Sequence, residues 1–376
     1  MHFAVGMILS ENRFPLFWIM LYKPDIATFG AAINVSANAV THGAKIGTSV
    51  KVAVIQVKRG IGDVIWHLPF IQAIAAATPG GQVTFLAPPS SCAEDLLAAD
   101  PSVAETIYFE HGGSELKRAV NLLKLTALLR WQRFGKVFVL DRTLRPALAA
   151  RLAGVPERIG LGLGAQRYFI TNPGIDQSHF HDQPVDWLVA LMAAAKVPFA
   201  STEPNLRLPA STLTAIREKF AAAPRPWIAL GLGASHPDKD WPDSHWAEFL
   251  AGLRQRIQGT VFMVGGSMNS ARGQNFIAQS AGAPVINACD LRLTEAAALL
   301  RLADLFVGPS SAPMNLAIAG GTDAFGLFGS TPVLKYSKRI HAIVPPGGPS
   351  PDGMKRILPA QALAQMAPYL TRTKRA

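Results

Sequence analysis

Cysteine and charge are both scarce in this chain of 376 residues. The two cysteines, Cys92 and Cys289, lie far apart and belong to no Cys-x-x-Cys pattern or Cys/His cluster, which excludes a disulfide framework and a zinc signature. We expect both to be buried, reduced and inert. Charged residues make up 16% and hydrophobic residues 49%, a balance that excludes a disordered tail or a coiled coil. The length favours two domains, each with its own core.

A long, uninterrupted apolar run is also missing near the start. The stretch at 14–22 contains Pro15 and is shorter than the roughly 20 residues that cross a bilayer. Glu11 and Arg13 precede it and no clear small-residue cleavage site follows, so it does not fit a signal peptide. We expect residues 1–49 to be a poorly specified extension, and the sequence leaves open whether they belong to the native protein.

Basic residues outnumber acidic ones. The 36 Lys and Arg against 25 Asp and Glu give a formal charge of +11, so the partners should be negatively charged. Nucleic acid, an anionic membrane surface and a phosphorylated substrate all fit this field. We do not expect nucleic acid to be the partner, because the chain has no groove-reading motif and no strip of basic and aromatic residues.

Short apolar runs alternate with helical patterns from residue 51 onward, which predicts parallel sheets covered by helices. In the first half, strands are predicted at 51–57, 82–87, 105–109 and 136–141, and a short strand running into a Gly-rich loop at 157–164. Helices are predicted at 63–77, 91–99, 114–133, 143–153 and 184–197. In the second half, strands are predicted at 227–233, 260–266, 284–288, 304–309 and 323–329, with helices between them. We therefore predict an α/β protein of two doubly wound, Rossmann-like domains facing a central cleft.

The boundaries follow from these elements and from proline-rich passages. We assign residues 50–208 to the first Rossmann-like domain, 209–226 to a linker, 227–358 to the second Rossmann-like domain, and 359–376 to a C-terminal helix and basic tail.

A Gly-bearing turn, 58–63, follows the first predicted strand. Gly60 and Gly62 allow a tight turn that brings backbone N–H groups close to an anion, and Lys58 and Arg59 add positive charge. Asp63 has two readings: a helix N-cap, or a carboxylate that takes a proton from a hydroxyl nucleophile.

The loop at 233–242 carries Lys239 between two aspartates, ahead of Trp241 and Pro242. Pro242 fits the first turn of the next helix and Trp241 a hydrophobic staple. Lys239 is suited to a diphosphate, although a solvated surface lysine is an equally simple reading.

The segment 309–320 places Ser310 or Ser311 at the start of a helix of small residues. The free N–H groups of such a helix start can bind an anion, but small residues can equally serve close helix packing. Residues 310–315 therefore have two readings, as a phosphate site and as a packing element.

Together, the motifs at 59–69, 231–242, 264–266 and 304–317 resemble glycosyltransferase family 9, the lipopolysaccharide heptosyltransferases. The resemblance implies a GT-B fold and metal-independent, inverting transfer of a sugar, most simply heptose from ADP-heptose, to a lipopolysaccharide core or related envelope glycan. No cofactor is implied. The resemblance makes the domain at 50–208 acceptor-binding and the domain at 227–358 nucleotide-sugar-binding. It makes Asp63 the base and Lys239 the residue that steadies the donor diphosphate. Further donor contacts are implied at Gly265, Gly266, Ser310, Ser311, Ala312, Met314 and Asn315, and acceptor contacts at Arg59, Gly62 and Arg145.

One motif departs from the family. The family segment usually reads Asp-Ser/Thr-Gly-Pro-Met/Leu-His, whereas residues 310–315 read Ser-Ser-Ala-Pro-Met-Asn, so a carboxylate and an imidazole are missing. This leaves open a second interpretation, a degenerate member that binds nucleotide sugar or glycan without turnover.

We expect an enzyme in the cytoplasm, peripheral to the inner face of the bacterial inner membrane, where the charge and the basic end TRTKRA attract it to anionic lipid.

Overall fold

The computed structural model describes residues 50–234, 236–278 and 284–373. The expected extension 1–49 lies outside these residues, as do Lys374 and Arg375 of the basic C-terminal end. None of the described helices is both long enough and apolar enough to cross a membrane.

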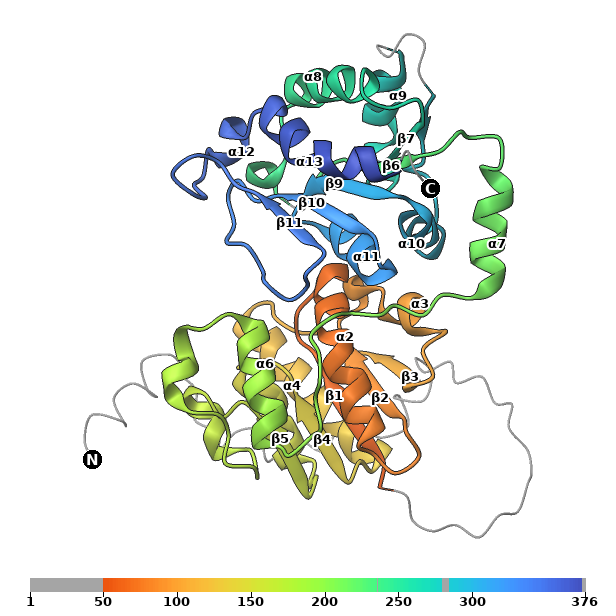
Figure 1. Ribbon diagram of the computed structural model, residues 1–376. Helices are drawn as coiled ribbons and strands as arrows, with labels where there is room; N and C mark the ends of the chain where they lie inside the picture. The colour runs from red at the N-terminus through yellow and green to blue at the C-terminus, as the bar shows by residue number, and fades with distance from the viewer. Residues whose placement is uncertain (1–49, 235, 279–283, 374–376) are drawn as a thin grey trace. The chain divides into compact units, whose positions relative to one another are not determined.

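The first lobe is built on a parallel sheet of five strands (Figure 1). Its order is β3-β2-β1-β4-β5. The strands are β1 (Val52–Ile55), β2 (Val83–Ala87), β3 (Val103–Tyr108), β4 (Lys136–Val139) and β5 (Glu157–Gly160). Because β1 is the central strand and every one of its residues is buried, its side chains alternate between two apolar cores.

Helices cover both faces of this sheet. They are α2 (Ile61–Ala76), α3 (Ala93–Leu97), α4 (Glu115–Gln132), α5 (Leu144–Leu152) and α6 (Pro184–Ala194). Val52 and Val54 of β1 belong to the core that includes α2 and α6, whereas Ala53 and Ile55 belong to the core under α4 and α5.

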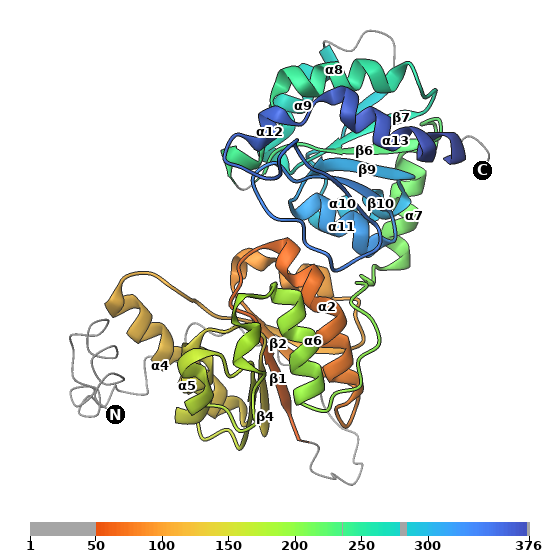
Figure 2. The ribbon, with the colours of Figure 1, turned by 60° about the vertical axis from the view of Figure 1, so that its left-hand side comes forward.

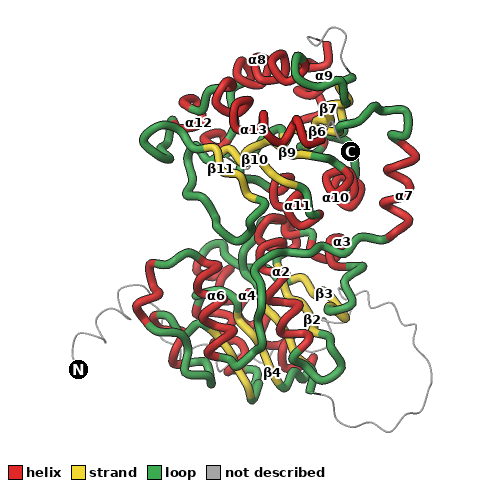
Figure 3. The backbone as a smooth tube through the Cα atoms, in the orientation of Figure 1, coloured by secondary structure: helices red, strands yellow, loops and turns green. Residues whose placement is uncertain are grey.

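The second lobe repeats this architecture with six parallel strands in the order β11-β10-β9-β6-β7-β8. The strands are β6 (Trp227–Gly231), β7 (Thr260–Val264), β8 (Val285–Asn287), β9 (Leu305–Pro309), β10 (Asp323–Leu327) and β11 (Ile340–Ile343). The helices are α7 (Ala210–Lys219), α8 (Asp243–Arg254), α9 (Ser270–Ala278), α10 (Leu293–Leu302), α11 (Ala312–Gly320), α12 (Gly353–Arg356) and α13 (Pro359–Thr373). Helices again flank the strands, as Figure 3 shows. The predicted α/β class with two doubly wound sheets is confirmed.

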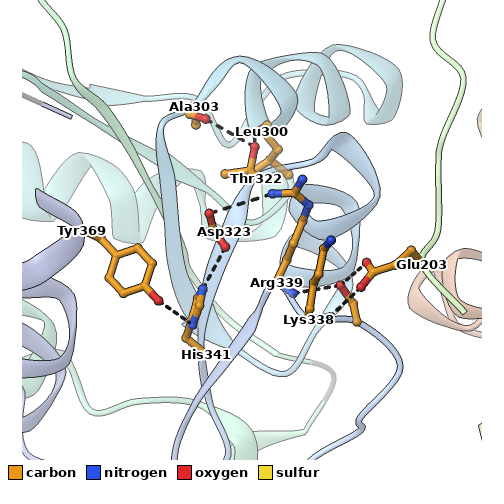
Figure 4. Close-up of polar contacts among 10 residues, drawn as sticks. Glu203, Leu300, Ala303, Thr322, Asp323, Lys338, Arg339, His341 and Tyr369 are labelled. Carbon is orange, nitrogen blue, oxygen red and sulfur yellow. Dashed lines mark hydrogen bonds and ion pairs between the residues drawn. The ribbon is translucent and has the colours of Figure 1, made fainter. Parts of the chain in front are cut away.

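Strand β11 was not predicted. It extends the sheet beyond β10, with Phe325 paired to His341. His341 Nε2 lies 2.8 Å from Asp323 Oδ1, and the Tyr369 hydroxyl lies 3.3 Å from His341 Nδ1 (Figure 4). These contacts tie the edge strand to β10 and to α13.

The start of α8 shows the expected staple. Trp241 precedes the cap residue Pro242, and its ring centroid lies 4.9 Å from that of Trp246 in the first turns of the helix. Trp241 is fully buried, and its Nε1–H donates to the Ile357 carbonyl at 2.9 Å. Pro242 is the N-cap and not a residue of the first turn, because the helix begins at Asp243.

The chain passes from the first lobe to the second through residues 197–209, which form neither helix nor strand. Thr202 Oγ1–H donates to the Tyr336 carbonyl at 2.7 Å. Glu203 accepts from the Ser337 hydroxyl at 2.6 Å and from the Lys338 N–H at 2.7 Å (Figure 4). Helix α7, inside the predicted linker 209–226, packs against α10 of the second lobe. The domain boundaries themselves remain a prediction.

One expectation about cysteine is wrong in part. Cys289 is buried, but Cys92 is only partly so, because it caps α3 in a left-handed conformation with φ 50°. Burial raises the pKa of both thiols, that of Cys289 to about 11.

Candidate active site

The candidate residues gather where the strand order of each sheet reverses. In the first sheet the reversal lies between β1 and β4, and in the second between β6 and β9. Loops at the carboxyl ends of such strand pairs diverge and leave room for a ligand. Asp63 and Arg145 follow β1 and β4, whereas Lys239 and residues 310–315 follow β6 and β9.

Asp63 lies in the first turn of α2. Helix α2 begins at Ile61, two residues earlier than predicted, so Gly60 is the N-cap and Asp63 the third helical residue. Its Oδ2 accepts the Gly60 N–H at 3.0 Å, and its Oδ1 accepts the Trp66 Nε1–H at 3.2 Å. The interpretation of Asp63 as the N-cap residue is therefore wrong, because Gly60 occupies that position. The Asp63 carboxylate still stabilises the helix start by accepting the Gly60 N–H.

Asp141 is a second carboxylate at this reversal point, and the sequence reasoning did not single it out. It follows β4, is 6% exposed, and its Oδ2 accepts the Val57 N–H at 2.8 Å. Burial raises the pKa of Asp141 to about 6; the Val57 hydrogen bond and Lys58 oppose this rise, and the negative charge of Asp63 adds to it. Two carboxylates thus share the edge formed by β1 and β4.

His67 lies one helical turn after Asp63 and is completely buried. Its Nδ1 lies 2.7 Å from the Asp63 carbonyl oxygen, and its ring stacks on Trp66. Its Nε2 has no hydrogen-bond partner in the described part of the chain. The pKa of His67 is lowered to about 3, mainly by burial. The hydrogen bond to the Asp63 backbone raises this pKa and the charge of Lys58 lowers it, and the imidazole is neutral.

Arginines gather around His111, just before α4. Burial lowers the pKa of His111, and the charges of Arg145, Arg59 and Arg118 lower it further. The Arg59 guanidinium donates to the His111 carbonyl. The fold thus brings Arg59 and Arg145, predicted as acceptor contacts, into one basic cluster with Arg118. Sequence reasoning missed Arg118 and His111.

Lys239 ends a short 3₁₀ turn, Pro237–Lys239, in the loop after β6. It is partly buried, and its ammonium has no hydrogen-bond or ion-pair partner among the described residues. The neighbouring Asp240 does not pair with it, because Asp240 Oδ2 lies 2.7 Å from Arg272 Nη1, and Asp243 also accepts from Arg272. Asp240 and Asp243 are therefore both engaged by Arg272.

Gly265 and Gly266 follow β7. A side chain at Gly265 would collide with the Leu232 carbonyl, and Gly266 has φ +76°, a conformation that favours glycine. Asn269 Nδ2–H donates to the Gly265 carbonyl at 2.8 Å. These residues let the loops after β6 and β7 approach closely.

Residues 310–315 place the start of α11 at the second reversal point. Ser311 is the N-cap, and its Oγ is buried without a hydrogen-bond partner among the described residues. Its side chain makes no cap hydrogen bond, so the first N–H groups of the helix remain open. Met314 is fully buried, so neither its side chain nor its backbone N–H is exposed to a ligand.

Asn315 faces the first lobe. Its Nδ2–H donates to the Ser311 carbonyl at 2.8 Å, and its Oδ1 accepts the hydroxyl of the buried Tyr336. A Cβ on Gly62 would come within 2.6 Å of Asn315 Nδ2, so the two residues are in close contact. Helices α2 and α11 pack together here (Figure 1).

Metal ligation has no obvious place in this arrangement. Within 50–234, 236–278 and 284–373, no group of three or more His, Cys, Asp or Glu side chains is placed to hold a metal ion.

Of the residues that were missed, Asp141 carried a usable signal, since it comes at the end of the predicted strand 136–141. His67 and Tyr336 carried none.

Comparison with known proteins identifies the family. A sequence model of glycosyltransferase family 9 (heptosyltransferase) matches residues 122–344, more than half of the chain. Lipopolysaccharide heptosyltransferase 2 of Escherichia coli (strain K12) is 24% identical over 306 residues, which are 76% of this chain and 86% of that protein.

Two solved structures share the fold. The E. coli ADP-heptose lps heptosyltransferase II has a TM-score of 0.68 and 23% identity, covering 87% of this chain and 100% of that one. An E. coli heptosyltransferase solved with ADP-2-deoxy-2-fluoro heptose has a TM-score of 0.63 and 14% identity, covering 87% and 100%. The predicted GT-B architecture is confirmed, and the chain is a glycosyltransferase that belongs to glycosyltransferase family 9.

Proposed function

We propose that this protein transfers heptose from ADP-heptose to the core of lipopolysaccharide, with inversion at the anomeric carbon and without a metal ion. The observation that carries the proposal is the contact between Asn315 and Gly62. It joins the start of α11, on the donor side, to the turn that presents Asp63 on the acceptor side. Donor and acceptor bound at these two places would meet beside Asp63.

The acceptor half of the reaction is assigned to the first lobe. Arg59 and Arg145 attract an acidic sugar or a phosphate of the acceptor, and Gly62 allows Asn315 of α11 to approach the start of α2. The Asp63 carboxylate takes the proton from the acceptor hydroxyl while the oxygen bonds to the anomeric carbon. The bond from that carbon to the diphosphate breaks at the same time, and the electron pair leaves with ADP.

The donor half is assigned to the second lobe. Lys239 neutralises the diphosphate as negative charge grows on it, and Gly265 and Gly266 allow its loop to come close. The Ser310 hydroxyl and the Ala312 N–H, both only partly buried at the helix start, would contact the same phosphates. Asn315 has both of its polar atoms engaged, so it acts by holding α11 against α2.

The altered segment 310–315 supports a second candidate function, binding of a nucleotide sugar without turnover. Residue 310 is a serine where the family has a carboxylate, and the amide of Asn315 is bonded within the protein. The presence of Asp63 and of an unpaired Lys239 among the described residues favours the active enzyme.

The protein is proposed to act at the cytoplasmic face of the inner membrane as a peripheral enzyme. A formal charge of +11 attracts it to anionic lipid, where the lipid-linked acceptor lies.

A donor panel tests the proposal. The purified chain is incubated with heptose-deficient lipopolysaccharide and with ADP-, GDP- or UDP-activated sugars, and release of nucleoside diphosphate is measured. Release from ADP-heptose that requires the acceptor supports transfer. Thermal stabilisation by ADP-heptose without release would instead support the binding protein.

A further inference from the structure

Helix α4 exposes an apolar stripe. Leu116, Val120, Leu123 and Trp131 are 77, 40, 49 and 65% exposed, and they make up four of the eleven large hydrophobic side chains exposed in the described part of the chain. Ala127, also exposed, lies between the last two. We call these five residues the α4 stripe.

The spacing places the stripe on one side of the helix. Successive members are four, three, four and four residues apart. At 3.6 residues per turn this keeps all five within one narrow sector. The opposite side, with Asn121, Leu125 and Leu129, is buried against the first lobe. The stripe therefore contributes nothing to the core of the lobe. An exposed, contiguous apolar patch of this kind usually marks an interaction surface.

Basic residues flank the stripe. Lys117 and Lys124 lie on one side and Arg130 on the other, all exposed, and Arg133 follows at the helix end. The helix contains a single acidic residue, Glu115, which is neutralised by Arg118 at 2.6 Å. An apolar face bordered by lysine and arginine suits the boundary between acyl chains and anionic headgroups, because the stems lie along the apolar surface while the charges reach the phosphates. A tryptophan at the end of the stripe also fits this boundary.

Helix α4, which carries the stripe, begins near the proposed acceptor site. Its first residue, Glu115, comes four residues after His111, and the charge of Arg118 lowers the pKa of His111 together with the charges of Arg145 and Arg59. Figure 2 shows α4 on the outer side of the first lobe beside α5. We propose that the α4 stripe lies on the surface of an anionic bilayer and delivers a membrane-bound acceptor to the arginine cluster. Only the second half of this proposal rests on the proposed function.

Flotation of the full chain with vesicles tests the surface. We expect binding to phosphatidylcholine vesicles that contain phosphatidylglycerol, and much weaker binding to phosphatidylcholine alone. The double variant L116S/L123S should lower the partition coefficient by at least about tenfold, because two leucine side chains no longer leave water. The matched control V189S/L358S replaces two hydrophobic residues of 41 and 57% exposure elsewhere and should bind like the parent.

A second readout follows Trp131 directly. Brominated lipids should quench the parent more than the W131F variant, since only the parent carries an indole at the membrane. L116S/L123S should keep the circular dichroism spectrum of the parent and its turnover of a soluble acceptor fragment. Turnover of that fragment tests the proposed function, and vesicle binding without donor tests the α4 stripe, so each can fail alone.

Three results would overturn the membrane surface. One is a parent that does not bind anionic vesicles, as expected if another part of the chain covers the stripe. Another is undiminished binding by L116S/L123S. The third is a parent that is dimeric in sedimentation and becomes monomeric in L116S/L123S, which would assign the stripe to a second copy.

Discussion

Replacing Asp63 with Asn separates the two roles of this carboxylate. The Asp63 carboxylate accepts the Gly60 N–H at 3.0 Å and the Trp66 Nε1–H at 3.2 Å, one on each oxygen. An Asn side chain has one acceptor oxygen and so keeps only one of these bonds. The loss of one bond to a charged acceptor, and of a negative charge at a helix start, should lower the free energy of unfolding by about 1–3 kcal/mol.

The effect on catalysis should be larger and distinct. An amide takes up no proton at neutral pH, and general base catalysis is typically worth about 10²- to 10⁴-fold, so kcat should fall by at least about a hundredfold. The binding of ADP-heptose should change little, because the proposed donor contacts lie on the second lobe. The assay is ADP release under saturating donor, with stability measured by urea unfolding.

Helix α10 supplies the matched control. Glu295 is the third residue of α10, and its carboxylate accepts the N–H of the cap residue Arg292 at 3.0 Å, as Asp63 does for Gly60. Glu295→Gln should therefore lose a similar cap contact and keep full turnover. A D63N enzyme with the turnover of the parent, or an E295Q enzyme with an equally reduced kcat, would refute the assignment of Asp63 as the base.

Three further predictions concern charge. Lys239→Ala should weaken the binding of ADP-heptose much more than that of adenosine in calorimetric titrations, whereas equal losses would indicate a packing role. Asp141 has a pKa of about 6 in the fold against an ordinary 3.8, so the fold favours its protonated form. This contribution of about 3 kcal/mol to the free energy of unfolding is fully present below about pH 4 and is lost as the pH rises through 6. The free energy of unfolding of Asp141→Asn should not fall over this pH range. If the variant keeps the pH dependence of the parent, the raised pKa of Asp141 is contradicted. His67 has the opposite effect, because its pKa is about 3 in the fold against an ordinary 6.5. Its neutral imidazole stabilises the fold above pH 6.5, and the free energy of unfolding should fall by about 4–5 kcal/mol as the pH drops toward 3. His67→Phe should remove this acid sensitivity of unfolding.

Most of the strands could be predicted because they are short, buried and rich in branched residues. Val52–Ile55, Trp227–Gly231 and Thr260–Val264 are buried at every position, so each forms a continuous apolar run in the sequence. Ile340–Ile343 was missed because it is an edge strand, only partly buried, with a histidine among its four residues. The start of α2 was misplaced because its N-cap is Gly60, which has no side chain to mark it.

The candidate site was predictable only in pieces. Strand-end positions and the family resemblance pointed to Asp63, Lys239 and Arg145, and the strand order explains how each pair of loops meets. The sequence held no sign that Tyr336 engages Asn315, since that contact depends on how distant loops pack. The pKa of Asp141 likewise depends on burial, which the sequence around it does not reveal.

At position 62, the stability of helix α2 and the contact with Asn315 favour different residues. A glycine inside a helix lowers its stability by roughly 0.5–1 kcal/mol relative to alanine, so α2 alone would favour alanine at position 62. A methyl group there would lie 2.6 Å from Asn315 Nδ2, and Asn315 is held in place by Ser311 and Tyr336. The same substitution thus stabilises one helix and pushes apart two lobes. Position 62 is consequently a place where the contact between α2 and α11 opposes the intrinsic stability of α2.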